Sequence, residues 1–336
     1  MMIREQAYPR IGLIGNPSDG YFGKTIAFVF SNFHAQVVLY ETPELKILPH
    51  TRDHSEFDSV DALVEDVNLY GYYGGIRLLK ATIKRFCDYC REHGHRLHDR
   101  NFTIRYHSSI PHMVGLAGSS AIIVACMRAL MNYYEIRIPK PDLAGLVWSV
   151  ETRELGISAG LQDRVAQVYE GMVYMNFDRE LMERQGHGQY EPLDIGLLPP
   201  LYMAYRADLS EQSDVFHNDL RARYDRGDPE VHQAMRDWAA LTDEARRCLV
   251  ERRGDGLGRL LDENFDRRAA LCRIGSENLR MIQAARAVGA SAKFTGSGGA
   301  IVGVCETDAM FDALSSALAP MGVRTLRPVL VPERNS

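Results

Sequence analysis

The stretch Pro111-His-Met-Val-Gly-Leu-Ala-Gly-Ser-Ser-Ala121 decides the fold. Its glycine-rich turn leads into residues 119–134, where Ala, Ile, Met and Leu dominate, and this predicts a helix buried on most of its circumference. The free N–H groups and positive dipole at the start of such a helix suit a phosphate. From these residues alone, helix capping is the favoured role of Ser119 and Ser120, although a hydroxyl there can also ligate Mg²⁺.

Two other glycine-rich segments lie far away in the chain, GNPSDGYFG at residues 15–23 and GSGG at 296–299. Each alone is a weak signal, because such loops also form ordinary tight turns. The run at 18–25 is not a Walker A phosphate loop, since Ser18 stands where that motif needs glycine. Asp19 has two interpretations that the sequence leaves open, an Asx-turn residue and a carboxylate that binds a substrate hydroxyl.

Glu151 and Asp163 stand twelve residues apart, on either side of a glycine-containing break, among apolar or small residues. Phosphoryl transfer uses such a pair, one carboxylate holding Mg²⁺ and the other orienting or deprotonating the attacking hydroxyl. The ordinary alternative is a surface or helix-capping carboxylate, which is the usual role of acidic residues.

Hydrophobic periodicity predicts an α+β protein in which strands and helices alternate without a regular βαβ period. The Gly- and Pro-containing run at 186–200 marks the expected domain boundary, and the second half is richer in helix. The expected strands are 10–15, 27–40, 102–107, 172–177, 292–295, 300–305 and 324–331, and the expected helices are 76–91, 119–134, 142–154, 162–169, much of 229–288 and 309–319.

Composition is that of an ordinary soluble protein: 336 residues, 39 Lys and Arg against 44 Asp and Glu, and a net charge of −5. The absence of a basic block disfavours nucleic acid as a partner, and no apolar stretch is long enough for a membrane span, so a cytoplasmic location is expected. The six cysteines show no framework spacing and are expected to be free thiols. Cys87 and Cys90 are interpreted as core residues rather than zinc ligands.

Taken together, the three glycine segments resemble, in order and spacing, the motifs of the GHMP small-molecule kinases. PRIGLIGNPSD at 9–19 resembles the first motif, residues 111–121 the phosphate-binding second, and KFTGSGGA at 293–300 the third. Within that family the chain looks most like the glucuronokinases known from plants, which share segments such as LGISAGLQDRVAQVYEG and NLYGYYGGIRLL. The tyrosines of the latter segment, Tyr70, Tyr72 and Tyr73, are candidates for stacking on a ligand or for core packing.

The resemblance implies a two-domain GHMP kinase fold, with a ribosomal-protein-like α+β domain at 1–195 and a ferredoxin-like, helix-rich α+β domain at 196–336. It implies an ATP-dependent kinase that uses Mg²⁺ and phosphorylates the anomeric hydroxyl of a sugar acid, D-glucuronate in the closest case. Galactokinase-like relatives have Glu-His where this chain has Asn16 and Pro17, which disfavours galactose.

The same resemblance assigns roles to individual residues. Asp163 corresponds to the catalytic aspartate, Arg10 to the first motif's arginine near the reacting centre, and Asp19 to an aspartate that binds a substrate hydroxyl. Mg²⁺ ligands are expected at Glu151 and at Ser119 or Ser120. The residues expected to bind ATP are Pro111, Gly115, Leu116, Ala117, Gly118, Ser119, Ser120, Ala121, Gly296, Ser297 and Gly298.

A uronic acid carries a carboxylate, which requires a basic partner, and Lys24, Arg77 and Arg164 are the candidates nearest the substrate-side motifs. Each of the three has an ordinary alternative as a surface or ion-paired residue. Other substrates stay open, namely galacturonate, a neutral aldose or a non-sugar alcohol. A non-catalytic nucleotide or sugar sensor on the same fold is the alternative of another class. The oligomeric state cannot be predicted.

Overall fold

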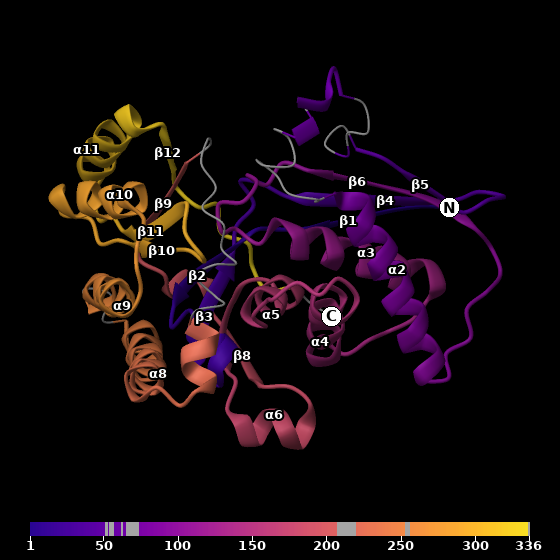
Figure 1. Cartoon of the computed structure of the whole chain (residues 1–336), viewed down its shortest axis with the longest axis horizontal. Coiled ribbons are helices and arrows are strands. Elements are labelled where there is room, and N and C mark those ends of the chain that lie inside the picture. The colour runs from indigo at the N-terminus through magenta and orange to yellow at the C-terminus, as the bar shows by residue number, and fades with distance from the viewer. Residues whose placement is uncertain are drawn as a thin grey trace. The chain divides into compact units, whose positions relative to one another are not determined.

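The computed structural model describes residues 1–50, 53, 57–61, 63–64, 74–206, 220–252 and 256–334 (Figure 1). Tyr70, Tyr72 and Tyr73 lie outside the described residues. The chain divides into two compact units that interleave along the sequence. Unit 1 comprises Met1–Tyr8, Phe33–Ile110 and Gly118–Ala159, and unit 2 comprises Pro9–Asn32, Pro111–Ala117 and Gly160–Ser336.

This division differs from the expected domain boundary after residue 195. The segment expected to link two domains instead contains strand β8 (Gln189–Leu193), which pairs with β7 (Met172–Asn176) inside unit 2. Unit 2 also takes its first two strands from the N-terminal part of the chain. The boundary at residue 195 stays a prediction.

Unit 1 is built on a four-stranded sheet covered by helices (Figure 1). In sheet order its strands are β1 (Met2–Ala7), β4 (Ala35–Glu41), β6 (Phe102–Ser108) and β5 (Lys46–Leu48). Helix α3 (Gly118–Tyr134) packs on β1 and β4, and α2 (Gly75–Glu92) packs on α3. The predicted burial of α3 is confirmed, because its apolar residues face both the sheet and α2.

The expected helix at 142–154 forms as two pieces in unit 1. Helix α4 (Lys140–Ser149) continues into η2 (Val150–Glu154), a π-helical turn that contacts both α4 and α2. A π-turn inserts an extra residue into the helical ladder and so changes the direction of the side chains that it carries. Glu151 is one of these side chains, and it is buried.

Unit 2 contains two antiparallel four-stranded sheets. The first consists of β2 (Arg10–Ile14), β3 (Lys24–Val29), β7 and β8, in that order. The second consists, in order, of β10 (Lys293–Phe294), β11 (Ala300–Val304), β9 (Leu201–Arg206) and β12 (Val323–Leu326). Strands β2, β3 and β11 lie almost wholly in the core, which explains why their sequences read as continuous apolar runs.

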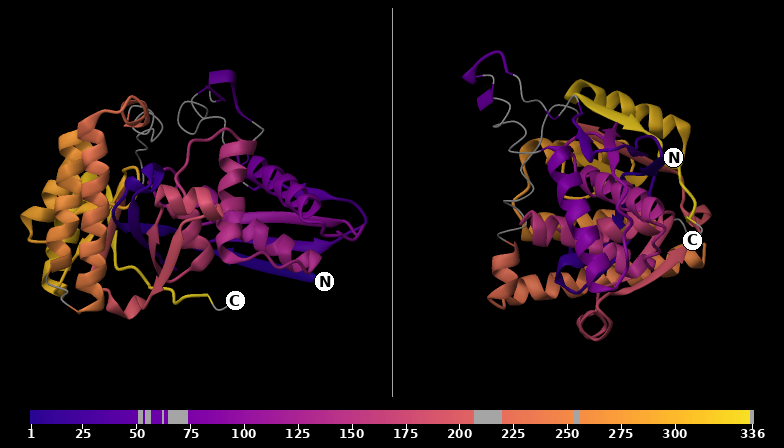
Figure 2. Two further views of the ribbon diagram at one scale, coloured as in Figure 1. Left: turned by 90° about the horizontal axis from the view of Figure 1, so that it is seen from below. Right: turned by 90° about the vertical axis from the view of Figure 1, so that its right-hand side faces the viewer.

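Helices cover both sheets of unit 2. The helical prediction for 229–288 is confirmed by α8 (Pro229–Val250), α9 (Leu257–Leu271) and α10 (Ser276–Ala287), and α8 and α9 lie side by side (Figure 2). Short helices η1 (Ser18–Tyr21) and α5 (Gln162–Tyr169) carry two of the candidate carboxylates. Other described helices are α6 (Arg179–Gln185), η3 (Ile195–Leu197), α11 (Asp308–Leu318) and η5 (Ala319–Met321).

The cysteine prediction is confirmed, because all six thiols are free. Cys90 is buried in α2 and Cys87 is partly buried, as expected of residues near the core. Among the described residues, no helix combines the length and the apolar character needed to cross a membrane.

Candidate active site

Arg10, at the start of β2, joins all the motif segments that belong to unit 2. Its Nε donates to Oδ1 of Asp163 at 2.5 Å, and its Nη1 donates to the carbonyl oxygens of Gly115 at 2.6 Å and Thr295 at 3.0 Å. The side chain is only 6% exposed. A planar guanidinium with a fixed fork of donors suits this task, since it satisfies three acceptors from three distant parts of the sequence.

Asp163 lies in the first turn of α5 and faces two arginines. Besides Arg10, Nη1 of Arg164 lies 3.5 Å from Oδ2, and the side chain is 20% exposed. Burial alone would raise the pKa of Asp163, but the charges of Arg10 and Arg164 outweigh it and hold the pKa below its usual value. Asp163 is therefore ionised at neutral pH and partly accessible, as an acceptor for a hydroxyl proton must be.

Asp19 lies in η1, close to the same carboxylate. Its Oδ2 accepts a hydrogen bond from the backbone N–H of Gln162 at 3.3 Å, and a Cβ at position 160 would collide with the carboxyl group, so Gly160 gives it room. Burial, with a further contribution from the charge of Asp163, raises the pKa of Asp19 to about 6. The two aspartates thus have pKa values pushed in opposite directions, a pattern typical of sites that work with protons.

We expect Asp19→Asn to stabilise the protein at pH 8 and to do so less at pH 5. The folded-state pKa of about 6 lies above the ordinary aspartate value of 3.8, so the stability linked to Asp19 is fully present below about pH 3.8 and is lost as pH rises through about 6. Asparagine removes this cost, which is at most about 3 kcal/mol. Urea unfolding of both proteins at the two pH values measures the difference, and an equal gain at both would contradict the raised pKa.

The third glycine segment packs directly on the second. A Cβ at Gly115, whose φ is +69°, would lie 2.9 Å from the carbonyl oxygen of Gly298, and a Cβ at Gly296 would lie 2.7 Å from Nη2 of Arg10. Arg268 of α9 holds this third segment, donating to the carbonyl oxygens of Gly296 at 2.7 Å and Ser297 at 2.6 Å. The glycines are therefore required by close backbone approach within unit 2.

Lys293 is a buried lysine that links the third motif to the first. Its Nζ donates to the carbonyl oxygens of Gly12 and Phe294 and to Oδ1 of Asn16, at 2.6–2.7 Å, and the residue is 1% exposed. Burial, together with the charges of Arg268 and Arg10, lowers the pKa of Lys293 well below its usual value. Three acceptors use all three hydrogens of an ammonium group, so the side chain serves to fix the two motifs against each other.

The Mg²⁺ candidates and part of the second motif belong to unit 1. Helix α3 begins at Gly118, Ser120 and Ala121 are buried in its first turn, and Ser119 is partly exposed. Glu151 is 3% exposed within η2. A buried carboxylate and a hydroxyl are oxygen donors of the kind that Mg²⁺ prefers, so these residues fit the ion chemically. Among the described residues, no cluster of three or more His, Cys, Asp or Glu side chains could bind a metal.

The three basic residues predicted to bind a substrate carboxylate have different surroundings. Nζ of Lys24 forms an ion pair, 2.6 Å long, with Asp243 of α8, so this lysine already has an acidic partner. In unit 1, Arg77 donates to the carbonyl oxygen of Leu155 at 3.1 Å from an exposed position. Arg164 alone lies with the two aspartates, and its Nη1 also donates to the carbonyl oxygen of Gly160 at 2.8 Å.

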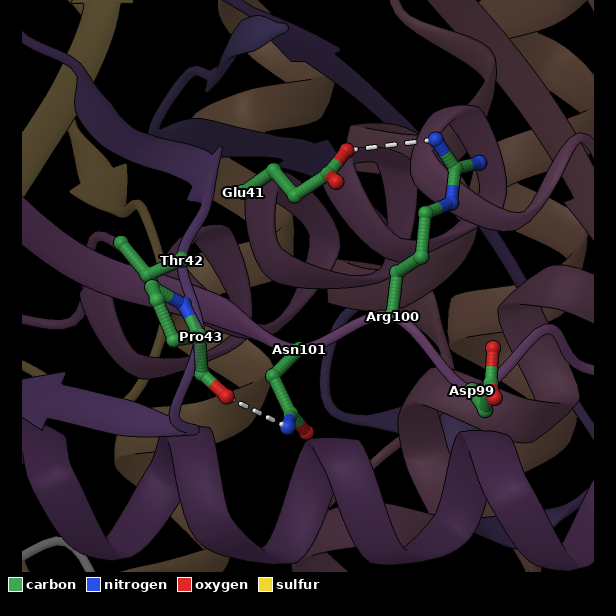
Figure 3. A pocket seen from close by; sticks show the side chains of 6 residues that line it. All are labelled: Glu41, Thr42, Pro43, Asp99, Arg100 and Asn101. Carbon is green, nitrogen blue, oxygen red and sulfur yellow. Dashed lines mark hydrogen bonds and ion pairs between the residues drawn. The ribbon is translucent and has the colours of Figure 1, made fainter.

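A separate hollow of about 440 Å³ lies in unit 1 (Figure 3). Among its lining residues, Arg100 forms an exposed ion pair with Glu41 at 3.2 Å. Asn101 donates a hydrogen bond to the carbonyl oxygen of Pro43. None of its lining residues belongs to the three motifs, and exposed pairs of this kind contribute little binding or stability. We assign no catalytic role to it.

Sequence reasoning missed several residues that shape the site. Arg268, Lys293 and Asn264, whose Oδ1 accepts from the backbone N–H of Gly15 at 2.7 Å, act on the motifs from distant parts of the chain. Lys293 carried one usable signal, a charge at the first position of the third motif, inside an apolar strand. Arg268 and Asn264 carried none, because they lie in a helix rich in charged residues.

Comparison with known proteins agrees with this geometry. The model of the GHMP kinases N terminal domain matches residues 77–171. The chain is 42% identical to glucuronokinase 1 of Arabidopsis thaliana, covering 98% of this chain and 92% of that protein. The chain belongs to the GHMP kinase family.

Other relatives extend this family assignment. Probable glucuronokinase 2 of Arabidopsis thaliana is 44% identical over 90% of this chain and 84% of its own length. Galactokinase from Lactococcus lactis, solved in complex with galactose, superposes with a TM-score of 0.75 at 14% identity, covering 99% of this chain and 95% of that chain. The α+β fold of GHMP kinases is thus confirmed over the whole length. This member of the family is a glucuronokinase-like, ATP-dependent sugar kinase that transfers phosphate to an alcohol group.

Proposed function

We propose that this GHMP kinase transfers the γ-phosphoryl group of ATP to the anomeric hydroxyl of D-glucuronate, forming D-glucuronate 1-phosphate and ADP. The observation that carries the proposal is the ionised Asp163, held by Arg10 and accompanied by Asp19, in a chain 42–44% identical to plant glucuronokinases. A sugar acid as substrate follows from those relatives.

In this proposal Asp163 receives the hydroxyl proton. The hydroxyl oxygen forms a bond to the γ-phosphorus while the bond to the β–γ bridging oxygen breaks, and ADP leaves. Arg10 orients the carboxylate and keeps it ionised, and Arg164 adds a second positive charge beside it. Asp19 accepts a hydrogen bond from a substrate hydroxyl at the pH values at which it is ionised, and thereby orients the sugar.

The nucleotide and metal assignments rest on the motif residues of each unit. We assign the phosphates of ATP to the second and third motifs, at Pro111, Gly115, Leu116, Ala117, Gly118, Ser119, Ser120, Ala121, Gly296, Ser297 and Gly298. Glu151 and one of the two serines would hold Mg²⁺, which supplies positive charge to the phosphates when bound. The start of α3 suits an anion because the positive end of the helix dipole lies there.

Sugar-dependent ADP release with Mg-ATP tests the proposal, using glucuronate, galacturonate, glucose, galactose, mevalonate and homoserine. We expect a preference for glucuronate that disappears in Asp163→Ala. Preference for a neutral sugar or for mevalonate would be consistent with a kinase but would overturn the assignment of glucuronate as its substrate. Nucleotide binding without ADP release for any acceptor would favour the non-catalytic sensor. The cytoplasmic location stays a prediction.

A further inference from the structure

Arg221 of unit 2 lies over the loop that carries Asp19. Its Nη2 donates to the carbonyl oxygen of Gly20, the residue after Asp19, at 2.5 Å. Its guanidinium carbon lies 4.3 Å from the centre of the Tyr21 ring and 6.0 Å from that of Tyr224. The position of the guanidinium is therefore fixed by a hydrogen bond and by stacking, both from η1.

Arg221 differs from the other arginines of the site in its exposure. Its side chain is 46% exposed, whereas those of Arg10 and Arg164 are each 6% exposed and donate to Asp163 and to backbone carbonyl oxygens. Nη1 of Arg221 lies 3.8 Å from Asp225, beyond hydrogen-bond distance, and Nη2 alone is used in a hydrogen bond within the described residues. Arg221 is thus a partly exposed side chain with N–H donors that no other described residue uses in a hydrogen bond.

The surroundings of Tyr21 place Arg221 and Asp19 near one phenol group. Burial raises the pKa of Tyr21 to about 12, with the charge of Arg221 lowering it and that of Asp19 raising it. Both charges therefore lie within electrostatic reach of the same oxygen. Gly20 between them has no side chain to cover the guanidinium, and a Cβ there would already lie 3.5 Å from Nη2.

We propose that Arg221 recognises the carboxylate of the sugar acid and so determines the preference for uronates over neutral sugars. This inference rests on the proposed function. The guanidinium offers the planar pair of donors that binds a carboxylate with two parallel hydrogen bonds. It is anchored on the backbone of the loop whose aspartate is assigned to a substrate hydroxyl, so one short segment would fix both the hydroxyl and the carboxylate ends of the sugar.

The test compares D-glucuronate with D-glucuronamide, a neutral analogue of nearly the same shape. For the wild-type kinase we expect kcat/KM to be ten- to hundredfold higher for glucuronate, the range expected of a charge-assisted hydrogen bond. In Arg221→Gln this ratio should fall to about threefold or less, through a higher KM for glucuronate, with little change for glucuronamide. Arg221→Lys, which keeps the charge without the fork, should give an intermediate ratio.

Arg259→Gln is the matched control, because Arg259 is also exposed but pairs with Glu244 of α8 and with Glu263 of its own helix, α9. This variant should keep the wild-type ratio of kcat/KM for glucuronate to kcat/KM for glucuronamide. A wild-type ratio retained in both Arg221 variants would overturn the inference while leaving glucuronate as the substrate. An equal loss for both substrates would also overturn it, since it would show that Arg221 only supports the loop. A wild-type kinase that phosphorylates neither compound would instead overturn the proposed function.

Discussion

Asp163→Asn is expected to lower kcat with glucuronate about 10²- to 10⁴-fold, the usual contribution of a proton-accepting group. Asparagine fits the same space and can still contact Arg10, but it neither carries the negative charge nor accepts the hydroxyl proton. Asp163 is a largely buried carboxylate that lies between two arginines, and their charges lower its pKa. Steady-state ADP release at saturating Mg-ATP measures the effect.

The control for this variant is Asp237→Asn. Asp237 also pairs closely with an arginine, Arg267 at 2.5 Å, but it lies on α8 outside the motif segments. Its kcat should stay within about twofold of wild type. ATP binding by Asp163→Asn, followed by calorimetry, should change little. A kcat above one tenth of the wild-type value in a folded Asp163→Asn protein would contradict the assignment of Asp163.

Arg10→Met is expected to destabilise the protein by about 3–5 kcal/mol, because it leaves Asp163 without its closest partner and removes one donor from each of the carbonyl oxygens of Gly115 and Thr295. Arg10→Lys should be better folded, but one ammonium group cannot replace a fork that contacts three acceptors, so we expect kcat/KM to fall about ten- to hundredfold. Urea unfolding and ADP release measure the two effects.

The pH profile separates a catalytic consequence of Arg10→Lys from simple loss of structure. Arg10 contributes most to lowering the pKa of Asp163, so displacing its charge raises that pKa. The acid limb of kcat should therefore move to higher pH than in the wild type. Arg246→Lys is the control, because Arg246 also makes two hydrogen bonds to one carboxylate, that of Glu191. An unchanged acid limb in Arg10→Lys would contradict the proposed influence on Asp163.

Much of the fold could be predicted because local signals in the sequence are strong. The apolar runs of β2, β3 and β11 and the buried face of α3 have periodicities that tertiary packing reinforces. The three motifs could be placed for the same reason, since glycine is needed wherever backbones approach as closely as Gly115 and Gly298 do. Such requirements are visible in one sequence.

The contacts between motifs could not be predicted, because they depend on how distant segments are brought together. Arg10 could be recognised as important by resemblance, yet its simultaneous contacts with Asp163, Gly115 and Thr295 span most of the chain. Arg221 lies in a polar segment rich in arginines and aspartates, where no pattern distinguishes it from Arg223, which pairs with Asp228 and Glu230 and donates to the carbonyl oxygen of Leu271. The interleaving of the two units is hidden for the same reason.

The most direct test of the central claim is the position of the phosphate in the product formed from glucuronate. The account predicts that nuclear magnetic resonance of the purified product shows coupling between phosphorus and the anomeric proton and carbon, and that Asp163→Asn forms almost none of this product. Coupling of phosphorus to any other position of the sugar, or a glucuronate that takes up no phosphate from Mg-ATP, would contradict it.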